Sequence, residues 1–467
     1  MSNWSDSPLF TTPAYGRPKG STRKLPPVQP DPQATADCHQ LVLTPGRCLQ
    51  TRVAGVFLFL PLLAQLRFDD LVTQAGYPGS GMIPAPAALL SLLTLKLLDK
   101  ERRSHITAFD FDEALGLFAG LNVLPKKSYA TDYSYRTLRT HQQALLSRWV
   151  AALAPVLFPE AQEFCLDFHA IPFRGEPEAA ENHYLPMRGK AAPSILSFVA
   201  YEPQSRVLCY SNADLTRADQ AEELMRFVAF WHDLIDQDPQ WLYFDSKVVP
   251  YSELAKVARR PIWFVTIRRR GAAILRRLDA VPARAWRRAV IDIPKRRHKN
   301  IRYLDETVKI RGYPEKLRQV AVAGLGRDEP TLCLSNNFQV SARELITRYV
   351  KRNGVEDALG ISVNFFHVDC LASEVRLNVD LDLALTVLAH GCYRWLATRL
   401  PGYDKAKPKQ AYQRFVATGG VVEIQTDRIV VHFEKRAHNP ILRAAALDQD
   451  CPPIPWLGGL PVAFEYP

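Results

Sequence analysis

The sequence predicts a mixed α/β fold with a helical N-terminal domain and a β-rich insertion that interrupts the central sheet. Three strand-like runs follow one another from residue 163, and helices then alternate with strands. This order favours a mixed sheet over repeated βαβ units. Apolar residues recur at helical spacing before this region, and short charged strands follow it. The 467 residues, 47% of them hydrophobic, are enough for two or three domains with real cores.

The N-terminal part is expected to consist of an arm and a helical domain. Residues 1–36 are rich in Pro, Ser and Thr and predict a disordered basic arm. Residues 37–155 predict helices, the longest at 135–158, with Asp132 or Ser134 as its N-cap. A basic turn precedes that helix, so this domain is a candidate for DNA binding. The alternative is a solvated helical face.

Residues 160–270 are expected to form the first part of the core. The predicted strands are 163–173, 194–203, 206–214, 241–244 and 261–269. The run Trp241–Phe244 is apolar throughout, which is typical of a strand buried on both faces. Asp245 follows at its carboxyl end, where open α/β sheets place their chemistry. Pro250 is expected in the first turn of the next helix.

The second half of the chain is expected to contain an insertion, the rest of the core and a tail. Residues 271–338 predict four short strands joined by charged turns, at the rim of the sheet. Residues 339–405 return to helical spacing, with one helix over 341–366 and another over 382–400. Residues 406–467 predict a C-terminal hairpin and tail, with Thr426 and Asp427 in the turn.

The positive charge belongs to one segment. The chain carries a net +11, and residues 268–318 hold 17 Lys and Arg against 5 Asp and Glu, a net of +12. The remainder is therefore close to −1. Arg296, Arg297 and Lys299 fall in a predicted connecting turn, with aromatic residues interleaved in the segment. A concentrated positive charge of this kind indicates a polyanionic partner such as DNA. The alternative is a solvated charged face.

Several classes of protein have no support in the sequence. The eight cysteines include no C-x-x-C pair, which argues against a zinc ribbon or a redox dithiol. No Walker loop, H-E-x-x-H or G-x-S-x-G motif is present. The longest apolar run, residues 53–66, is too short to span a bilayer and contains Pro61. No signal peptide is recognisable, so we expect a cytoplasmic protein without a membrane partner.

Three acids are candidates for catalysis. Asp167 lies within the first predicted strand and Asp245 ends a later one. Tyr349, Arg352 and Glu356 stand at i, i+3 and i+7, which puts them on one helical face if the helix is continuous. The alternatives are ordinary loop caps for the aspartates and a surface pair between Arg352 and Glu356, worth about 0.3–0.5 kcal/mol.

Two further residues bear on this choice. Glu374 is a rival third acid, since it lies in another acidic stretch nearby. His169 shares the strand face of Asp167. We interpret His169 as structural or as a neighbour of the metal ligands, with direct metal binding as the alternative.

These residues resemble the catalytic core of the DDE transposases. More narrowly, the spacing Y-x-x-R-x-x-x-E at 349–356 resembles that of the insertion-sequence-four superfamily of bacterial elements. The resemblance covers roughly residues 85–440 in element order. It implies a ribonuclease-H-like sheet that brings Asp167, Asp245 and Glu356 together. One position departs from the pattern, because Val363 stands where the family has a Lys; Asn364 or a cation of the insertion is the expected substitute.

The resemblance also implies a chemistry. Asp167, Asp245 and Glu356 would hold two Mg²⁺ ions, with Mn²⁺ as a substitute, while Tyr349 and Arg352 contact the DNA backbone. Hard cations prefer carboxylate oxygens, and two of them about 3.5–4 Å apart can activate the attacking oxygen and stabilise the leaving one.

The implied function is a nucleoid-associated bacterial transposase. It cleaves terminal repeats and joins them to target DNA, with a homodimer on paired ends as a further expectation. The alternatives are a related nuclease without strand transfer and a catalytically inactive DNA-binding relative.

Overall fold

The computed structural model describes residues 37–173, 180–185, 188–246, 248, 250–291, 299–326, 328–370 and 376–467. The predicted arm at 1–36, together with Arg296, Arg297 and Glu374, lies outside these residues. The described chain is a mixed α/β structure with a large mixed sheet and a smaller one. Within it, no helix is both long enough and apolar enough to cross a membrane.

The N-terminal part is helical, as its periodicity predicts. Its α-helices and 3-10 helices (η) are η1 (Ala54–Phe59), α1 (Leu60–Gln65), α2 (Phe68–Gln74), α3 (Ala85–Leu97), η2 (Arg103–Phe109), α4 (Glu113–Phe118), α5 (Lys127–Asp132), η3 (Tyr133–Arg136) and α6 (Arg139–Leu157). The expected N-cap of α6 is wrong. Leu138 caps this helix, because η3 forms a separate turn ahead of it, and the ring of His141 accepts the Leu138 N–H at 3.1 Å.

The large sheet is built from ten strands. They are β2 (Glu163–Pro172), β3 (Glu181–Leu185), β4 (Lys190–Glu202), β5 (Val207–Leu215), β6 (Trp241–Phe244), β7 (Trp263–Ile267), β8 (Arg287–Val290), β9 (Asn300–Lys309), β10 (Lys316–Ala323) and β11 (Thr331–Ser335). Their order is β3-β4-β2-β6-β7-β11-β10-β9-β8, with β5 also paired to β4. Strands β6 and β7 run parallel to β2, and the other pairings are antiparallel.

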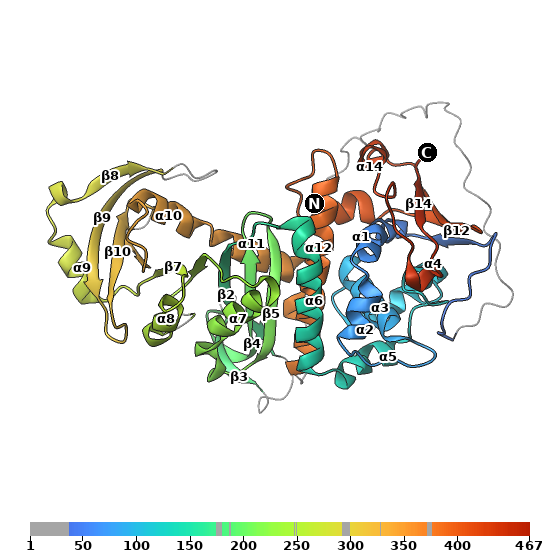
Figure 1. Cartoon of the computed structure of the whole chain (residues 1–467), viewed down its shortest axis with the longest axis horizontal. Helices are drawn as coiled ribbons and strands as arrows, with labels where there is room; N and C mark the ends of the chain where they lie inside the picture. Colours follow the sequence, from blue (N-terminus) through green and yellow to red (C-terminus); the bar gives the residue numbers. More distant parts are fainter. Residues whose placement is uncertain are drawn as a thin grey trace, which may run out of the picture.

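The predicted strands of the core and of the insertion are present, with two additions. Strand β3 and helix α9 (Ala272–Asp279) were not expected. The apolar side of α9 packs through Leu278 against Ala321 and Leu332, a small cluster apart from the main core. Because β11 pairs with β7, the insertion continues the central sheet rather than forming a separate one. Figure 1 shows its strands at one end of the molecule.

Helices cover both faces of the sheet. Side chains of a strand alternate between faces, and α7 (Glu223–Ile235) packs on the face of Phe164, whose ring contacts Phe227 and Trp231. Helix α8 (Tyr251–Ala258) connects the parallel strands β6 and β7. Pro250 precedes α8 as its N-cap instead of lying in its first turn, as its ψ of 158° is extended.

The remaining helices lie after the insertion. They are α10 (Ala342–Val350), α11 (Asn353–Asn364), η8 (Val368–Cys370), α12 (Arg376–Arg399), α13 (Pro408–Ala411), the π-helical turn η9 (Tyr412–Val416), α14 (Asn439–Ala445) and η10 (Pro455–Leu457). In Figure 1, α6 and α12 stand side by side between the strands β2, β4 and β5 and the part formed by the chain's N-terminal helices and C-terminal strands.

The smaller sheet joins both ends of the described chain. Its strands are β1 (Cys48–Thr51), β12 (Gly420–Ile424), β13 (Ile429–Phe433) and β14 (Val462–Glu465). The predicted hairpin is present, closed by a 2.9 Å hydrogen bond from the Gln425 N–H to the Arg428 carbonyl across Thr426 and Asp427. Strand β1 pairs with β12, a contact between the helical part and the tail that the sequence pattern does not predict.

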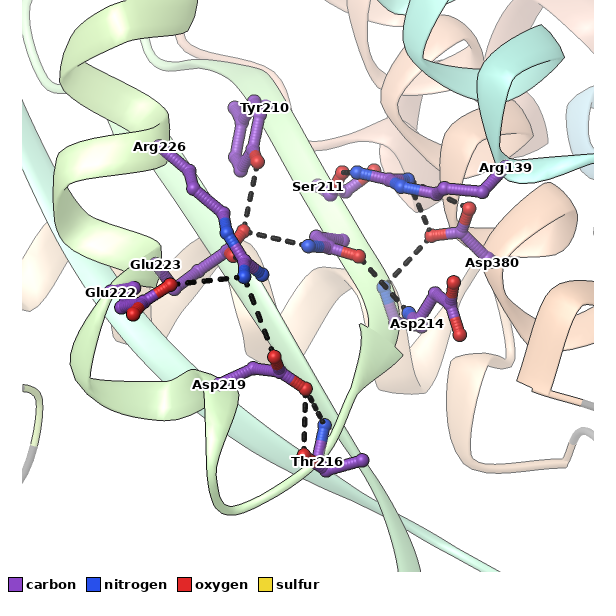
Figure 2. Close-up of polar contacts among 12 residues, drawn as sticks. Arg139, Tyr210, Ser211, Asp214, Thr216, Asp219, Glu222, Glu223, Arg226 and Asp380 are labelled. Carbon is purple, nitrogen blue, oxygen red and sulfur yellow. Dashed lines mark hydrogen bonds and ion pairs between the residues drawn. The ribbon is translucent and has the colours of Figure 1, made fainter.

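Buried charges hold β5 between helices on its two sides, as Figure 2 shows. Tyr210 donates to Glu223 of α7 at 2.8 Å. On the other side, Asp380 of α12 accepts the Ala213 N–H at 2.8 Å and a paired contact from Arg139 of α6 at 2.7 and 2.8 Å. Asp380 is fully buried, and its contacts join α6, α12 and β5.

Candidate active site

Asp167 and Asp245 are placed together by the register of two parallel strands. Leu166 on β2 pairs with Phe244 on β6, and these are the last paired positions. Asp167 on β2 and Asp245 just after β6 each follow by one residue, so they occupy neighbouring positions. Both side chains are partly buried. The sequence prediction that Asp245 ends a fully buried strand is confirmed, since every residue of β6 is buried.

The third candidate acid comes from a broken helix rather than from the continuous one expected. Tyr349 lies in the last turn of α10, and Glu356 lies in the first turn of α11. Between the two helices, successive backbone bonds join residues three apart, such as Arg352 N–H to the Tyr349 carbonyl at 3.0 Å. Asn353 and Gly354 have low helix propensity. A Cβ at Gly354 would stand 2.6 Å from the Tyr201 ring, so the backbone is packed tightly here.

Arg352 joins the three predicted residues despite this break. Its Nη1 donates to Asp167 Oδ2 at 3.2 Å, and its Nη2 donates to Glu356 Oε1. Its guanidinium lies 5.8 Å from the centre of the Tyr349 ring. The structure therefore brings Asp167, Arg352, Glu356 and Tyr349 into one cluster, beside Asp245.

The acids of this cluster influence one another. The pKa of Asp167 is raised to about 6: burial raises it most, the Arg352 charge opposes this, and the charges of Asp245 and Glu356 add smaller upward contributions. Burial also raises the pKa of the Tyr349 hydroxyl. Like charges disfavour each other's ionised form, so carboxylates that interact in this way need a cation.

The donor atoms suit Mg²⁺ or Mn²⁺, but a guanidinium lies among them. Carboxylate oxygens are the ligands these hard cations prefer. Within the described residues, no group of three or more His, Cys, Asp and Glu side chains is arranged to hold a metal ion. Arg352 pairs with two of the three candidate acids, since its terminal nitrogens engage Asp167 and Glu356. The carboxylate oxygens are donors of the kind that divalent cations prefer, with Arg352 as their present counter-charge.

Neighbouring contacts fix the helices on the sheet. On the strand face of Asp167, the Cys165 thiol donates to the Lys351 carbonyl at 3.3 Å. Glu163 accepts from Arg348 at 2.7 Å. Farther along the same face, His169 Nε2 lies 2.7 Å from Asp369 Oδ1. This contact gives His169 a structural partner after α11, and sequence reasoning did not identify Asp369 as that partner.

The acidic stretch that contains Glu374 has two aspartates that form ion pairs away from the candidate site. Asp380 pairs with Arg139, and Asp382 pairs with Lys96, with both aspartates buried in the core. Glu374 lies outside the described residues. Glu356 is therefore the candidate third acid with an observed link to Asp167, through Arg352.

Some arginines of the basic insertion form ion pairs with acids of the same segment. Arg318 forms a paired contact with Asp305 at 2.7 and 2.9 Å, and Arg277 forms one with Glu306 at 2.6 Å. Because the strands from β7 to β8 alternate in direction, the start of β9 lies at the same end of the sheet as the end of β6. Lys299, which precedes β9, is exposed at that end.

Comparisons with known proteins add little to this picture. No model of a known protein family matches the chain, and no curated protein sequence matches it. Among solved structures, the chain is similar to the piggyBac transposase in a synaptic complex with hairpin DNA. The TM-score is 0.40 at 12% sequence identity, over 74% of this chain and 78% of that one. A similarity at this level establishes neither fold nor function, so the residues of the chain itself must carry the assignment.

Proposed function

We propose that the chain is a DNA-cleaving and DNA-joining enzyme of the DDE type, a transposase acting through Asp167, Asp245 and Glu356. The observation that carries the proposal is the strand register that sets Asp167 beside Asp245, with Glu356 linked to Asp167 through Arg352. The three acids come from separate segments of the chain, and the charges of Asp245 and Glu356 act on Asp167, which supports a shared site. The strand order β5-β4-β2-β6-β7 supports a ribonuclease-H-like core.

Two Mg²⁺ ions, or Mn²⁺ in their place, would be held by these three carboxylates. The ions would activate the attacking oxygen and stabilise the leaving one in an in-line displacement at phosphorus. The chain's own residues position this chemistry. Strand β2 and the end of β6 hold the two aspartates, and the first turn of α11 presents Glu356. Arg352 and Tyr349 stand beside them, where a phosphate backbone would approach.

The substrate is expected to be double-stranded DNA carrying the terminal repeats of an insertion sequence. The net charge of +12 between residues 268 and 318 supports a polyanionic partner. With water as the nucleophile, the site would hydrolyse a phosphodiester bond. With a DNA 3′-hydroxyl as the nucleophile, it would join strands. A homodimer on paired ends and a place on the bacterial nucleoid belong to the same proposal.

A second candidate is a DNA-binding relative that does not cut. The observations in its favour are that Arg352 pairs with two of the acids and that the described residues hold no ready-made metal cluster. A nuclease that cuts DNA without strand transfer is the third candidate function, which the sequence pattern also allows.

One assay separates these functions. The full chain is incubated with Mg²⁺ and a supercoiled plasmid that carries the DNA flanking the gene as candidate ends. A transposase gives excised and joined products, a nuclease gives nicked or linear DNA alone, and a non-cutting relative leaves the plasmid intact while shifting it on a gel. Intact plasmid with candidate ends known to be correct would rule out the transposase.

A further inference from the structure

The guanidinium of Arg352 donates hydrogen bonds to carboxylates, and the rest of its donors are poorly satisfied. Its side chain is 13% exposed. Both terminal nitrogens engage carboxylates, whereas the buried Nε has no hydrogen-bond partner within the described residues. A guanidinium has five N–H donors in a fixed fork, and burial without a partner is costly. The carboxylates are therefore the main reason for this side chain to lie where it does.

The contacts of Arg352 use oxygens that a metal ion would need. Asp167 Oδ2 and Glu356 Oε1 each accept from the guanidinium. A carboxylate oxygen that faces a divalent cation at ligand distance cannot keep the same short contact with a guanidinium, because the two cations repel. Three carboxylates against one guanidinium also leave the site negative, so a divalent cation remains attracted to it.

The backbone at Arg352 is fixed, which leaves the side chain as the moving part. Backbone hydrogen bonds hold the turn on both sides of it, from Arg352 N–H to Tyr349 and from Val355 N–H to the Arg352 carbonyl at 3.1 Å. Gly354 packs against the Tyr201 ring too closely for a Cβ. The long side chain of Arg352 can leave the two carboxylates by rotating about its own bonds toward the Tyr349 ring.

We propose that Arg352 is an internal counter-ion of the acid site, and that it competes with divalent cations for Asp167 and Glu356. In the absence of a cation the guanidinium relieves the repulsion between the carboxylates. Cation binding releases the guanidinium, which then becomes available to a phosphate of the DNA backbone. Cation and DNA thus act on one side chain, and by linkage each strengthens the binding of the other. This inference rests on the function proposed above.

The test measures cation binding and not activity. Isothermal titration calorimetry of Mn²⁺ into the full-length protein, without DNA, compares wild type with Arg352→Gln. We expect the variant to bind Mn²⁺ with a Kd at least about fivefold lower, the lower end of common couplings between sites. The control is Arg343→Gln, which removes the same charge from an exposed position on α10 and should leave the Kd within about twofold of wild type.

A second variant protects the test against misfolding. Arg352→Lys keeps the positive charge but loses the paired N–H donors, and its Kd should fall between those of wild type and Arg352→Gln. If Mn²⁺ binds saturably with the same Kd in wild type and both variants, Arg352 is not a counter-ion of the acids, while the metal site itself is supported. Absence of saturable binding in wild type and in both variants would overturn this inference together with the proposed function.

Discussion

Asp167 on β2 and Asp245 just after the parallel strand β6 are neighbours, each one residue past the last paired position of the two strands. Two carboxylates in this relationship repel each other unless a cation lies between or beside them, and burial raises the pKa of Asp167 to about 6. A protein that needed only a stable sheet would gain from an apolar residue at either place. This juxtaposition is the feature of the fold that most needs a functional explanation.

The first prediction removes one charge from this pair. Asp167→Asn and Asp245→Asn should each abolish cleavage of supercoiled DNA while leaving DNA binding intact or slightly tighter, because losing an acid does not weaken attraction to phosphate. Gel shift and plasmid cleavage measure the two properties. Asp357→Asn, at an exposed position next to Glu356, is the matched control and should cleave like wild type. Loss of binding together with cleavage in a folded variant would argue against the assignment.

The second prediction concerns the buried pair between Arg139 and Asp380. Asp380→Asn should lower the free energy of unfolding by about 3–5 kcal/mol, because it leaves the Arg139 cation buried without its counter-charge. Urea denaturation followed by circular dichroism measures the change. Asp357→Asn again serves as the control, since its exposed pair with Lys407 is worth about 0–1 kcal/mol. Equal costs for the two substitutions would mean that the pair does not hold α6 and α12 together.

The sequence predicted what depends on local pattern. Apolar periodicity located most strands and helices, and the buried run Trp241–Phe244 placed Asp245 correctly at a strand end. The roles of Asp380 and Asp382 could not be predicted, because their partners Arg139 and Lys96 lie more than 200 residues away in the chain. An acidic stretch has the same appearance whether it faces solvent or pairs in a core.

The break between α10 and α11 shows a second limit. Spacing alone put Tyr349, Arg352 and Glu356 on one helical face, yet the backbone tightens between them where Gly354 meets Tyr201 of β4. Helical periodicity continues across the break, so it gave no signal. The contact between Arg352 and Asp167 depends on this tertiary packing, and only the local pair between Arg352 and Glu356 could be predicted from spacing.

The third prediction is a pH effect on stability. Burial lowers the pKa of His390 to about 4 from 6.5, so the unfolded chain binds one more proton than the folded one between these values. Stability then rises with pH, is fully present above about pH 6.5 and falls by about 2 kcal/mol between pH 6.5 and pH 5. His390→Asn keeps an acceptor for the Leu208 N–H but does not titrate. Urea titrations at pH 7 and pH 5 should show a smaller loss for this variant, and an identical loss would contradict the prediction.

The fourth prediction tests the basic insertion. Replacing Arg296, Arg297 and Lys299 by Ala should weaken DNA binding and reduce the slope of log affinity against log salt by about 0.9 for each lost phosphate contact. Fluorescence anisotropy at several salt concentrations measures this slope. The control replaces Arg428, Lys435 and Arg436 near the small sheet, which removes the same charge elsewhere. Equal slopes for the two triple variants would mean that the insertion has no special part in binding DNA.

The last prediction decides the third acid between Glu356 and Glu374, which are 18 residues apart. Five turns of an unbroken helix would put both on one face, so periodicity cannot choose between them. The contact of Glu356 with Arg352, which also reaches Asp167, favours Glu356. Because the Glu356 side chain is 54% exposed, Glu356→Gln should cost little stability, and the amide oxygen still accepts from Arg352.

We expect Glu356→Gln to abolish strand cleavage and to reduce the rise in melting temperature that Mg²⁺ produces, since a ligand that binds only the folded state stabilises it. Glu374→Gln should retain both properties. Differential scanning fluorimetry with and without Mg²⁺, beside the plasmid assay, measures them in the same preparations. The opposite pattern in two folded variants would move the third ligand to Glu374 and would remove the residue spacing on which the resemblance to the insertion-sequence-four superfamily depends.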